Sequence, residues 1–222
     1  VDKNADFGIV VDPDVDRLAL VCEDGKMFGE EYTLVTIADF VLSKTPGNTV
    51  SNLSSTRALR DVTNKHNGNY EASAVGEVNV VEKMKATNAI IGGEGNGGVI
   101  YPTLHYGRDA LIGVALFLTQ LAERKISAKT LRDTYPNYFI SKNKIQLTPD
   151  IDVDNILTTL EEKYKNEQIT TIDGFKIDFK DGWVHLRKSN TEPIIRIYAE
   201  SEDEKKANTF AQKMIQEIKK LL

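Results

Sequence analysis

The sequence predicts an α/β protein, in which a doubly wound parallel sheet is followed by a smaller α+β unit with an antiparallel sheet. Up to residue 124, short β-branched runs alternate with stretches of helical periodicity, which is typical of a parallel sheet covered by helices. Beyond about residue 138 this alternation stops, and polar strands joined by Asp-Gly turns replace it. With 222 residues, of which 41% are hydrophobic, the chain can build one large or two small cores.

The first half of the chain opens with two apolar runs, at residues 7–11 and 18–22, whose length and β-branched content predict strands. A helix is predicted from Glu30, because apolar residues recur at helical spacing until Pro46 and Gly47 end the pattern. Further strands and helices then alternate, the strands at 49–54, 70–75 and 88–94 and the helices at 56–66, 78–85 and 110–124.

The second half has a different pattern. A polar strand at 139–147 is followed by Pro149 and Asp150, and then by an amphipathic helix at 153–163. Three strands come next, joined by turns at 173–174 and 181–182. The chain closes with a charged helix from residue 202, whose apolar stripe consists of Phe210, Met214, Ile218 and Leu221. We therefore expect a separate α+β unit, with a boundary near residues 140–150.

Composition excludes several classes of protein. The net charge is −5, from 28 basic and 33 acidic residues, which argues against a general nucleic-acid binder. The longest apolar runs are shorter than the ~20 residues that a bilayer span needs, so we expect no membrane partner. A single cysteine, Cys22, cannot form an internal disulfide, and this favours a reducing, cytoplasmic setting.

An acidic loop, DPDVDR, directly follows the first predicted strand. Its three carboxylates, Asp12, Asp14 and Asp16, provide oxygen ligands of the kind that Mg²⁺ prefers. An EF-hand loop is disfavoured, because Arg17 stands where that loop needs glycine. A phosphatase that uses Asp12 as its nucleophile and a solvated acidic turn both remain open.

A glycine-rich loop, GGEGNGG at residues 92–98, follows the predicted strand at 88–94. Its five glycines let the backbone approach a ligand closely, and Glu94 and Asn96 are the only side chains in it able to recognise one. A carboxylate and an amide two residues apart can bracket neighbouring hydroxyls of a sugar. The alternative is a mobile turn without a ligand.

A third polar motif, RKSNTEPIIR, lies between two predicted strands near the end of the chain. Guanidinium groups, hydroxyls and free backbone N–H groups can together bind a phosphate. A polar β-turn with surface arginines is the alternative. The candidate phosphate ligands are Arg187, Ser189, Asn190, Thr191 and Arg196.

Taken together, the three motifs resemble those of the α-D-phosphohexomutases, the family of phosphoglucomutase, phosphomannomutase and phosphoglucosamine mutase. DPDVDR is similar to the family's D-x-D-x-D-R metal loop, GGEGNGG to its G-E-x-[SN]-G sugar loop, and RKSNTEPIIR to its R-x-S-x-T-E-P-x-x-R phosphate loop. The motifs stand in the family's order from Asp12 to Arg196, so the resemblance covers most of the chain.

The resemblance implies a four-domain isomerase that moves phosphate between O1 and O6 of a hexose through a phosphoserine and a bisphosphorylated intermediate. It implies Mg²⁺ at the three aspartates, with Arg17 as the catalytic residue that steers the phosphoserine. Glu94 and Asn96 would bind O3 and O4 of the sugar, and the third motif would bind the phosphate that is not reacting. The implied partners are a phosphorylated hexose, a hexose bisphosphate and the N-terminal domains of the same enzyme.

The nucleophile of that family is not found in this sequence, because no serine is followed by His-Asn-Pro. We therefore expect an inactive fragment, made of the tail of the second domain (1–28), the third domain (29–140) and the fourth domain (141–222).

The general acid or base is the second departure from the family. Many relatives carry histidine where this chain has Gly98, and histidine or aspartate where it has Glu77. His105 and Arg108 are local candidates for the role, although a histidine beside Tyr106 is also typical of a structural hydrogen bond.

Two other functions stay open at this point, a metal-dependent phosphatase and a phosphosugar-binding module without catalysis. The candidate sugars are glucose, mannose and glucosamine, which differ at C2. Asn96 in place of serine resembles the phosphoglucosamine-mutase-like and archaeal-type members.

Overall fold

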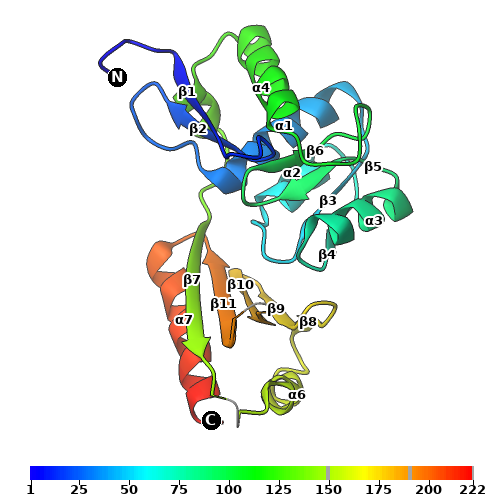
Figure 1. The fold of residues 1–222 in the computed structure, drawn as a ribbon, viewed down its shortest axis with the longest axis vertical. Coiled ribbons are helices and arrows are strands. Elements are labelled where there is room, and N and C mark those ends of the chain that lie inside the picture. Colours follow the sequence, from blue (N-terminus) through cyan, green and yellow to red (C-terminus); the bar gives the residue numbers. More distant parts are fainter. Residues whose placement is uncertain (149–150, 190–191, 222) are drawn as a thin grey trace. The chain divides into compact units, whose positions relative to one another are not determined.

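The computed structural model describes residues 1–148, 151–189 and 192–221. They form two compact units, Val1–Pro136 (unit 1) and Asn137–Leu222 (unit 2), which are described separately here (Figure 1). Among the described residues, no helix is long and apolar enough to cross a membrane.

Unit 1 is built on a four-stranded sheet in the order β4-β3-β5-β6. The strands are β3 (Asn48–Asn52), β4 (Tyr70–Ser73), β5 (Ala89–Glu94) and β6 (Gly98–Ile100). Strands β3, β4 and β5 are parallel, whereas β6 returns antiparallel to β5 directly after the glycine loop. The predicted α/β class is confirmed, and β6 is an addition that the sequence pattern did not predict because it is only three residues long.

Helices cover both faces of this sheet. They are α1 (Glu30–Lys44), α2 (Ala58–Lys65), α3 (Glu77–Thr87), α4 (Ala110–Arg124) and the short α5 (Ala128–Arg132). The connection through α2 leads from β3 outward to β4, and the connection through α3 leads back past β3 to β5. Because such crossovers are right-handed, the two helices lie on opposite faces, and accordingly α2 packs against α1 whereas α3 packs against β3 and β5.

The ends of α4 follow from local chemistry. The Asp109 carboxylate accepts the backbone N–H groups of Leu111 and Ile112, which have no partner within the helix. Lys125 ends the helix in the left-handed conformation with φ 52°. These two residues fix the helix at 110–124, as the sequence predicts.

A separate two-stranded antiparallel sheet precedes this core, formed by β1 (Phe7–Val11) and β2 (Leu18–Cys22). It is joined to the rest of unit 1 by burial of Leu18 and Leu20, each 1% exposed, and by Phe117, whose ring contacts Phe7 and Phe28 edge to face. Residues 1–28 thus belong to unit 1, and their assignment to the tail of a second domain stays a prediction.

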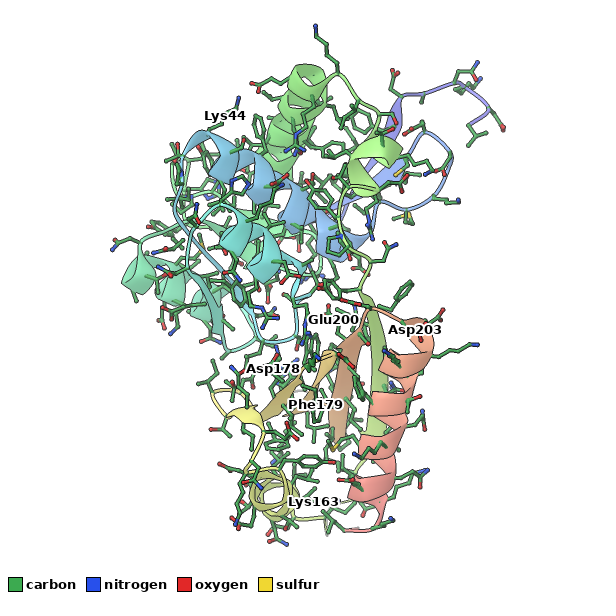
Figure 2. The ribbon with its side chains drawn as sticks, turned by 180° about the vertical axis from the view of Figure 1, so that it is seen from behind. Lys44, Lys163, Asp178, Phe179, Glu200 and Asp203 are labelled. Atoms are coloured by element: carbon green, nitrogen blue, oxygen red, sulfur yellow. The ribbon has the colours of Figure 1, made fainter. Side chains whose placement is uncertain are left out.

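Unit 2 is an antiparallel five-stranded sheet in the order β7-β11-β10-β9-β8. The strands are β7 (Phe139–Gln146), β8 (Gln168–Thr170), β9 (Phe175–Phe179), β10 (Gly182–Lys188) and β11 (Ile194–Ser201). Its described residues also form the helices α6 (Val153–Lys163) and α7 (Glu204–Lys219). Each begins after an aspartate whose side chain accepts a backbone N–H, Asp152 for α6 and Asp203 for α7. Asp203 is labelled at the start of α7 in Figure 2. Pro149 and Asp150, predicted to separate β7 from α6, lie outside the described residues.

The apolar stripe of α7 packs into the core of unit 2. Met214 and Ile218 are buried with Ile156 and Leu160 of α6 and with the sheet residue Ile197, while Phe210 is partly buried against the same core. Leu221 was predicted in this stripe but is 42% exposed, because the helix ends at Lys219.

Candidate functional site

The acidic loop lies between β1 and β2 and is shaped by its own backbone. Oδ1 of Asp12 accepts the N–H groups of Asp16 and Arg17, both at 3.2 Å. Val15 has φ 57°, a left-handed conformation that is strained for a β-branched residue. The carbonyl of Val15 also accepts the first N–H of α4, from Ala110 at 3.2 Å. The strained backbone at Val15 persists only because the surrounding structure holds it, and strained residues of this kind are common at functional sites.

The carboxylates of this loop differ in environment. Burial raises the pKa of Asp16, and the nearby Asp12 carboxylate raises it further, against the opposing effect of the Arg108 guanidinium. For Asp12, desolvation would raise the pKa, but the N–H groups of Arg17 and Asp16 outweigh it and lower the pKa overall. Asp14 is exposed.

A magnesium site was predicted from these three aspartates. Within the part of the chain that the structure describes, no three His, Cys, Asp or Glu side chains are grouped so as to hold a metal ion. The donors nevertheless fit a hard cation in kind, because all are carboxylate oxygens and Oδ1 of Asp16 is buried without a hydrogen-bond partner. The residues therefore suit Mg²⁺ in chemistry, and the site itself remains a prediction.

The glycine loop connects β5 to β6 and runs against two other segments. A Cβ at Gly95 would collide with the carboxylate of Glu31 on α1. A Cβ at Gly97, where φ is +87°, would collide with the carbonyl oxygen of Leu18. The N–H of Leu18 in turn donates to the carbonyl of Gly97 at 3.0 Å, so the acidic and glycine loops are joined through their backbones.

Glu94, at the end of β5, is only 5% exposed and is surrounded by donors. Its Oε1 accepts Asn52 Nδ2 at 2.7 Å and the N–H of Gly76 at 3.2 Å, and its Oε2 accepts Arg108 Nη1 at 3.1 Å. A carboxylate offers about four lone-pair sites, so three donors leave about one for a ligand. Glu94 is thus held in a fixed orientation.

Asn96 lies in the same loop and lines an open hollow of about 540 Å³, together with Asp12 and Arg17 of the acidic loop. The Asn96 Oδ1 atom accepts the N–H of Gly98 at 3.2 Å, which leaves its amide nitrogen for another partner. The structure thus brings Asp12, Arg17 and Asn96 to one hollow, although they come from distant parts of the sequence.

His105 and Arg108, the candidates for general acid or base, lie in the connection between β6 and α4. His105 Nε2 is 3.1 Å from Oδ2 of Asp109, so this exposed ring supports the residue that caps α4. Arg108 instead points to carboxylates, with Nη2 2.5 Å from Asp16 and Nε 3.3 Å from Glu77. A guanidinium does not lose its proton in proteins, so its role here is electrostatic.

The candidate phosphate loop of unit 2 lies at the end of the β10–β11 hairpin. Arg187 and Arg196 are direct partners across the two strands, where like charges repel. Each has a carboxylate nearby, since Arg187 Nε is 3.8 Å from Asp173 and Arg196 Nη2 is 2.9 Å from Glu192.

Ser189 follows Arg187 and is 8% exposed. Its Oγ accepts the N–H of Glu192 at 3.3 Å. Asn190 and Thr191, also predicted to bind phosphate, lie outside the described residues. The hairpin therefore brings Arg187, Ser189 and Arg196 together within unit 2.

Sequence reasoning did not single out Asn52, which ends β3 and donates to Glu94. A signal was available, because Asn52 stands at the carboxyl end of a parallel strand, where the ligands of α/β proteins bind. Ser55 was missed too; its Oγ accepts the N–H of Gly95 at 2.9 Å and thereby holds the glycine loop.

Two family models match the chain. The description of the first is phosphoglucomutase/phosphomannomutase, alpha/beta/alpha domain III, and it matches residues 29–138. The second, described as the C-terminal domain of the same group, matches residues 148–217.

Individual proteins are similar along nearly the whole chain. It is 34% identical to a phosphoglucosamine/phosphogalactosamine mutase of Sulfurisphaera tokodaii, over 98% of this chain and 48% of that protein. It is 35% identical to a phosphoglucomutase/phosphomannomutase of Thermococcus kodakarensis, over 93% of this chain and 45% of that protein. A crystal structure of a phosphoglucomutase/phosphomannomutase family protein from Burkholderia thailandensis superposes with a TM-score of 0.83 at 26% identity, covering 97% of this chain and 46% of that one. The chain thus spans about half the length of the relatives it matches.

Proposed function

The chain belongs to the phosphoglucomutase/phosphomannomutase family, and from this premise we propose that it is the C-terminal part of a phosphohexomutase, which interconverts hexose 1-phosphate and hexose 6-phosphate. The phosphoserine nucleophile belongs to the N-terminal part of the enzyme. The 222 residues supply the cation loop, the sugar loop and the phosphate loop.

The observation that carries this proposal is the junction of the two loops in unit 1. The backbone bond between Leu18 and Gly97 places the acidic loop beside the glycine loop, and Asp12, Arg17 and Asn96 share one hollow. A phosphohexomutase needs such a junction, because the reacting phosphate and the sugar that carries it must be held side by side.

In the proposed reaction, a phosphoserine oxygen loses its phosphoryl group to a free hydroxyl of the hexose phosphate, which gives a hexose bisphosphate. The other phosphoryl group then returns to the serine and releases the isomeric monophosphate. Arg17, exposed beside Asp12, donates to the oxygens of the phosphoserine and orients it. Mg²⁺ bound by Asp12, Asp14 and Asp16 would withdraw charge from the phosphoryl oxygens.

The sugar is held by two side chains of the glycine loop. Glu94 accepts one sugar hydroxyl with its remaining lone pair, and Asn96 donates to a neighbouring hydroxyl through its amide nitrogen. Because Glu94 is fixed by three donors, it loses little entropy when the sugar binds.

The phosphate that is not reacting binds the hairpin of unit 2. Arg187 and Arg196 lie opposite each other, so their two positive charges suit a doubly charged phosphate. The substrate class is glucose, mannose or glucosamine phosphate, and Asn96 in place of serine resembles the phosphoglucosamine-mutase-like and archaeal-type members of the family. A single, buried Cys22 agrees with a reducing cytoplasm as the place of action.

Two other functions have less support. A phosphatase that used Asp12 as its nucleophile would need a nearby lysine, and among the described residues that line the hollow beside Asp12 none is a lysine. The second alternative is a binding module without catalysis, and this is how we expect the chain to behave when it is separated from the N-terminal half.

The test joins this chain to the missing N-terminal half and assays the whole enzyme with glucose, mannose and glucosamine 1-phosphate. We expect turnover of at least one hexose, and loss of that turnover in Asp16→Asn. Lys44→Gln, a change on the exposed end of α1, is the matched control and leaves turnover intact. The isolated chain should be inactive, because loss of a covalent nucleophile costs several orders of magnitude in rate. A stoichiometric phosphoserine in the isolated chain after incubation with glucose 1,6-bisphosphate would contradict the proposal.

A further inference from the structure

Arg108 is the central cation of the site in unit 1. One guanidinium contacts three carboxylates from three segments: Nη2 is 2.5 Å from Asp16, Nη1 is 3.1 Å from Glu94, and Nε is 3.3 Å from Glu77. The Arg108 side chain is only 15% exposed. The acidic loop, the glycine loop and the N-terminus of α3 therefore meet at this one residue.

The backbone around Arg108 fixes the path of its side chain. Arg108 pairs with Ile100 at the end of β6, and its own N–H donates to Oε1 of Glu77 at 2.9 Å. A Cβ at position 98 would lie 2.5 Å from Cδ of Arg108, so only glycine leaves room for the side chain to pass. The path of the Arg108 side chain thus explains glycine at position 98 independently of any ligand.

The charges at this junction do not balance. Three carboxylates face the Arg108 guanidinium, and Oδ1 of Asp16 is buried without a hydrogen-bond partner; its nearest cation is Arg17, whose Nε is 3.9 Å away. A buried carboxylate oxygen without a donor is costly, and a cation is the partner that relieves it best. A divalent cation that binds Asp16 must, however, come close to the Arg108 guanidinium, whose Nη2 is already 2.5 Å from Oδ2 of Asp16. The two cations repel each other at such a separation.

We propose that Arg108 is a positioning residue that holds Asp16 and Glu94 together while no divalent cation is bound, and that it competes with that cation for Asp16. Cation binding at the acidic loop therefore loosens one arm of the Arg108 bridge and changes how firmly Glu94 is held. This inference rests on the proposed function only in taking the acidic loop as a divalent-cation site.

The first test measures Mg²⁺ binding to the 222-residue chain by calorimetry at low salt. Arg108→Met removes the competing charge and should tighten Mg²⁺ binding about tenfold, which corresponds to ~1.4 kcal/mol. Arg108→Lys keeps the charge without the fork and should stay near the wild-type affinity. Arg124→Met is the matched control, because Arg124 pairs with Asp39 far from the loop and its loss should not change Mg²⁺ affinity. Equal or weaker binding by Arg108→Met, or no binding by either protein, would overturn the competition.

The second test measures the coupling without metal. Asp16→Asn and Glu94→Gln are combined in a double-mutant cycle, read as the thermal midpoint of unfolding in EDTA. With Arg108 present the two shifts should be non-additive, because both carboxylates share one cation; in Arg108→Met they should add. Additive shifts in both backgrounds would refute the positioning role. If the coupling and the tighter Mg²⁺ binding are found but the joined enzyme converts no hexose phosphate, the proposed function fails and the role of Arg108 stands.

Discussion

Replacing Asp39 should weaken unit 1 strongly and in a pH-dependent way. Asp39 lies on α1 with only 1% of its side chain exposed, and four side chains donate to it. They are His66 Nε2 and Arg124 Nη2 at 2.8 Å, the Tyr135 hydroxyl at 3.0 Å and Lys65 Nζ at 3.3 Å. These donors come from the end of α2, from α4 and from the segment after α5, so the carboxylate ties three segments of unit 1 to α1.

The lowered pKa of Asp39 gives the size of its contribution to the folding free energy. Burial disfavours the charged carboxylate, but the hydrogen bonds from His66 and Arg124 outweigh it and lower the pKa from 3.8 to about 2. Since the folded pKa lies below the unfolded one, the stabilisation is complete above pH 3.8 and is lost as the pH falls to about 2. The difference corresponds to about 2 kcal/mol of folding free energy, since one pKa unit is worth a little more than about 1 kcal/mol.

We expect Asp39→Asn to lower the free energy of unfolding by about 2 to 4 kcal/mol near neutral pH, because the partly buried Arg124 guanidinium loses its counter-charge. Near pH 2 the penalty should shrink by about 2 kcal/mol, since about half of the wild-type carboxyl groups are then neutral as well. Urea unfolding followed by far-ultraviolet circular dichroism measures both values; the single tryptophan, Trp183, lies in unit 2 and does not report on unit 1.

The control for this prediction is Glu123→Gln. Glu123 also links α4 to α1, through a 2.5 Å contact with Lys44, but both side chains are about half exposed. Such a surface pair is worth about 0 to 1 kcal/mol, and its loss should be small. An Asp39→Asn penalty that is equal near pH 7 and near pH 2, or no larger than that of Glu123→Gln, would refute the reasoning.

Three further predictions concern the loops and unit 2. Gly97→Ala should destabilise the chain by about 1 to 3 kcal/mol in thermal unfolding, because φ is +87° and the new Cβ collides with the Leu18 carbonyl; an unchanged midpoint would mean that the loops are not joined there. Arg196→Ala should weaken binding of inorganic phosphate by ~10- to 100-fold in an NMR titration, by removing a charge-assisted contact of ~1.5 to 3 kcal/mol, and equal affinities would exclude Arg196 as a ligand. Tyr164→Phe should cost about 1 kcal/mol in urea unfolding, since the hydroxyl donates to both oxygens of Glu217 at 2.9 and 3.0 Å; a stabilised variant would contradict this.

Much of the fold was predictable because its signals are local. The helices at 110–124 and 153–163 have the predicted limits, since each begins at a capping aspartate and carries a clear apolar period. The strands at 7–11 and 18–22 were also predicted at their observed positions. Strand β6 and helix α5 were not predicted, because elements of three and five residues are too short to show a period.

The candidate site residues could be named from the sequence, whereas their contacts could not, and their roles stay predictions. The acidic, glycine and phosphate motifs were found from residue type and spacing alone. Asn52 and Ser55, which hold Glu94 and the glycine loop, escaped notice because each is an ordinary polar residue until folding brings it there. Arg108 was considered for proton transfer, whereas the structure places it among three carboxylates.

The sequence by itself determined the class of fold and the family, because hydrophobic period, turn residues and compact motifs are properties of short segments. Only the tertiary structure decided which charges meet. Asp16, Glu77, Glu94 and Arg108 are separated by many residues, and their approach depends on the order of the strands, on the path that Gly98 leaves open and on the pairing of Leu18 with Gly97. Electrostatic interaction depends on distance and burial, neither of which a linear pattern contains.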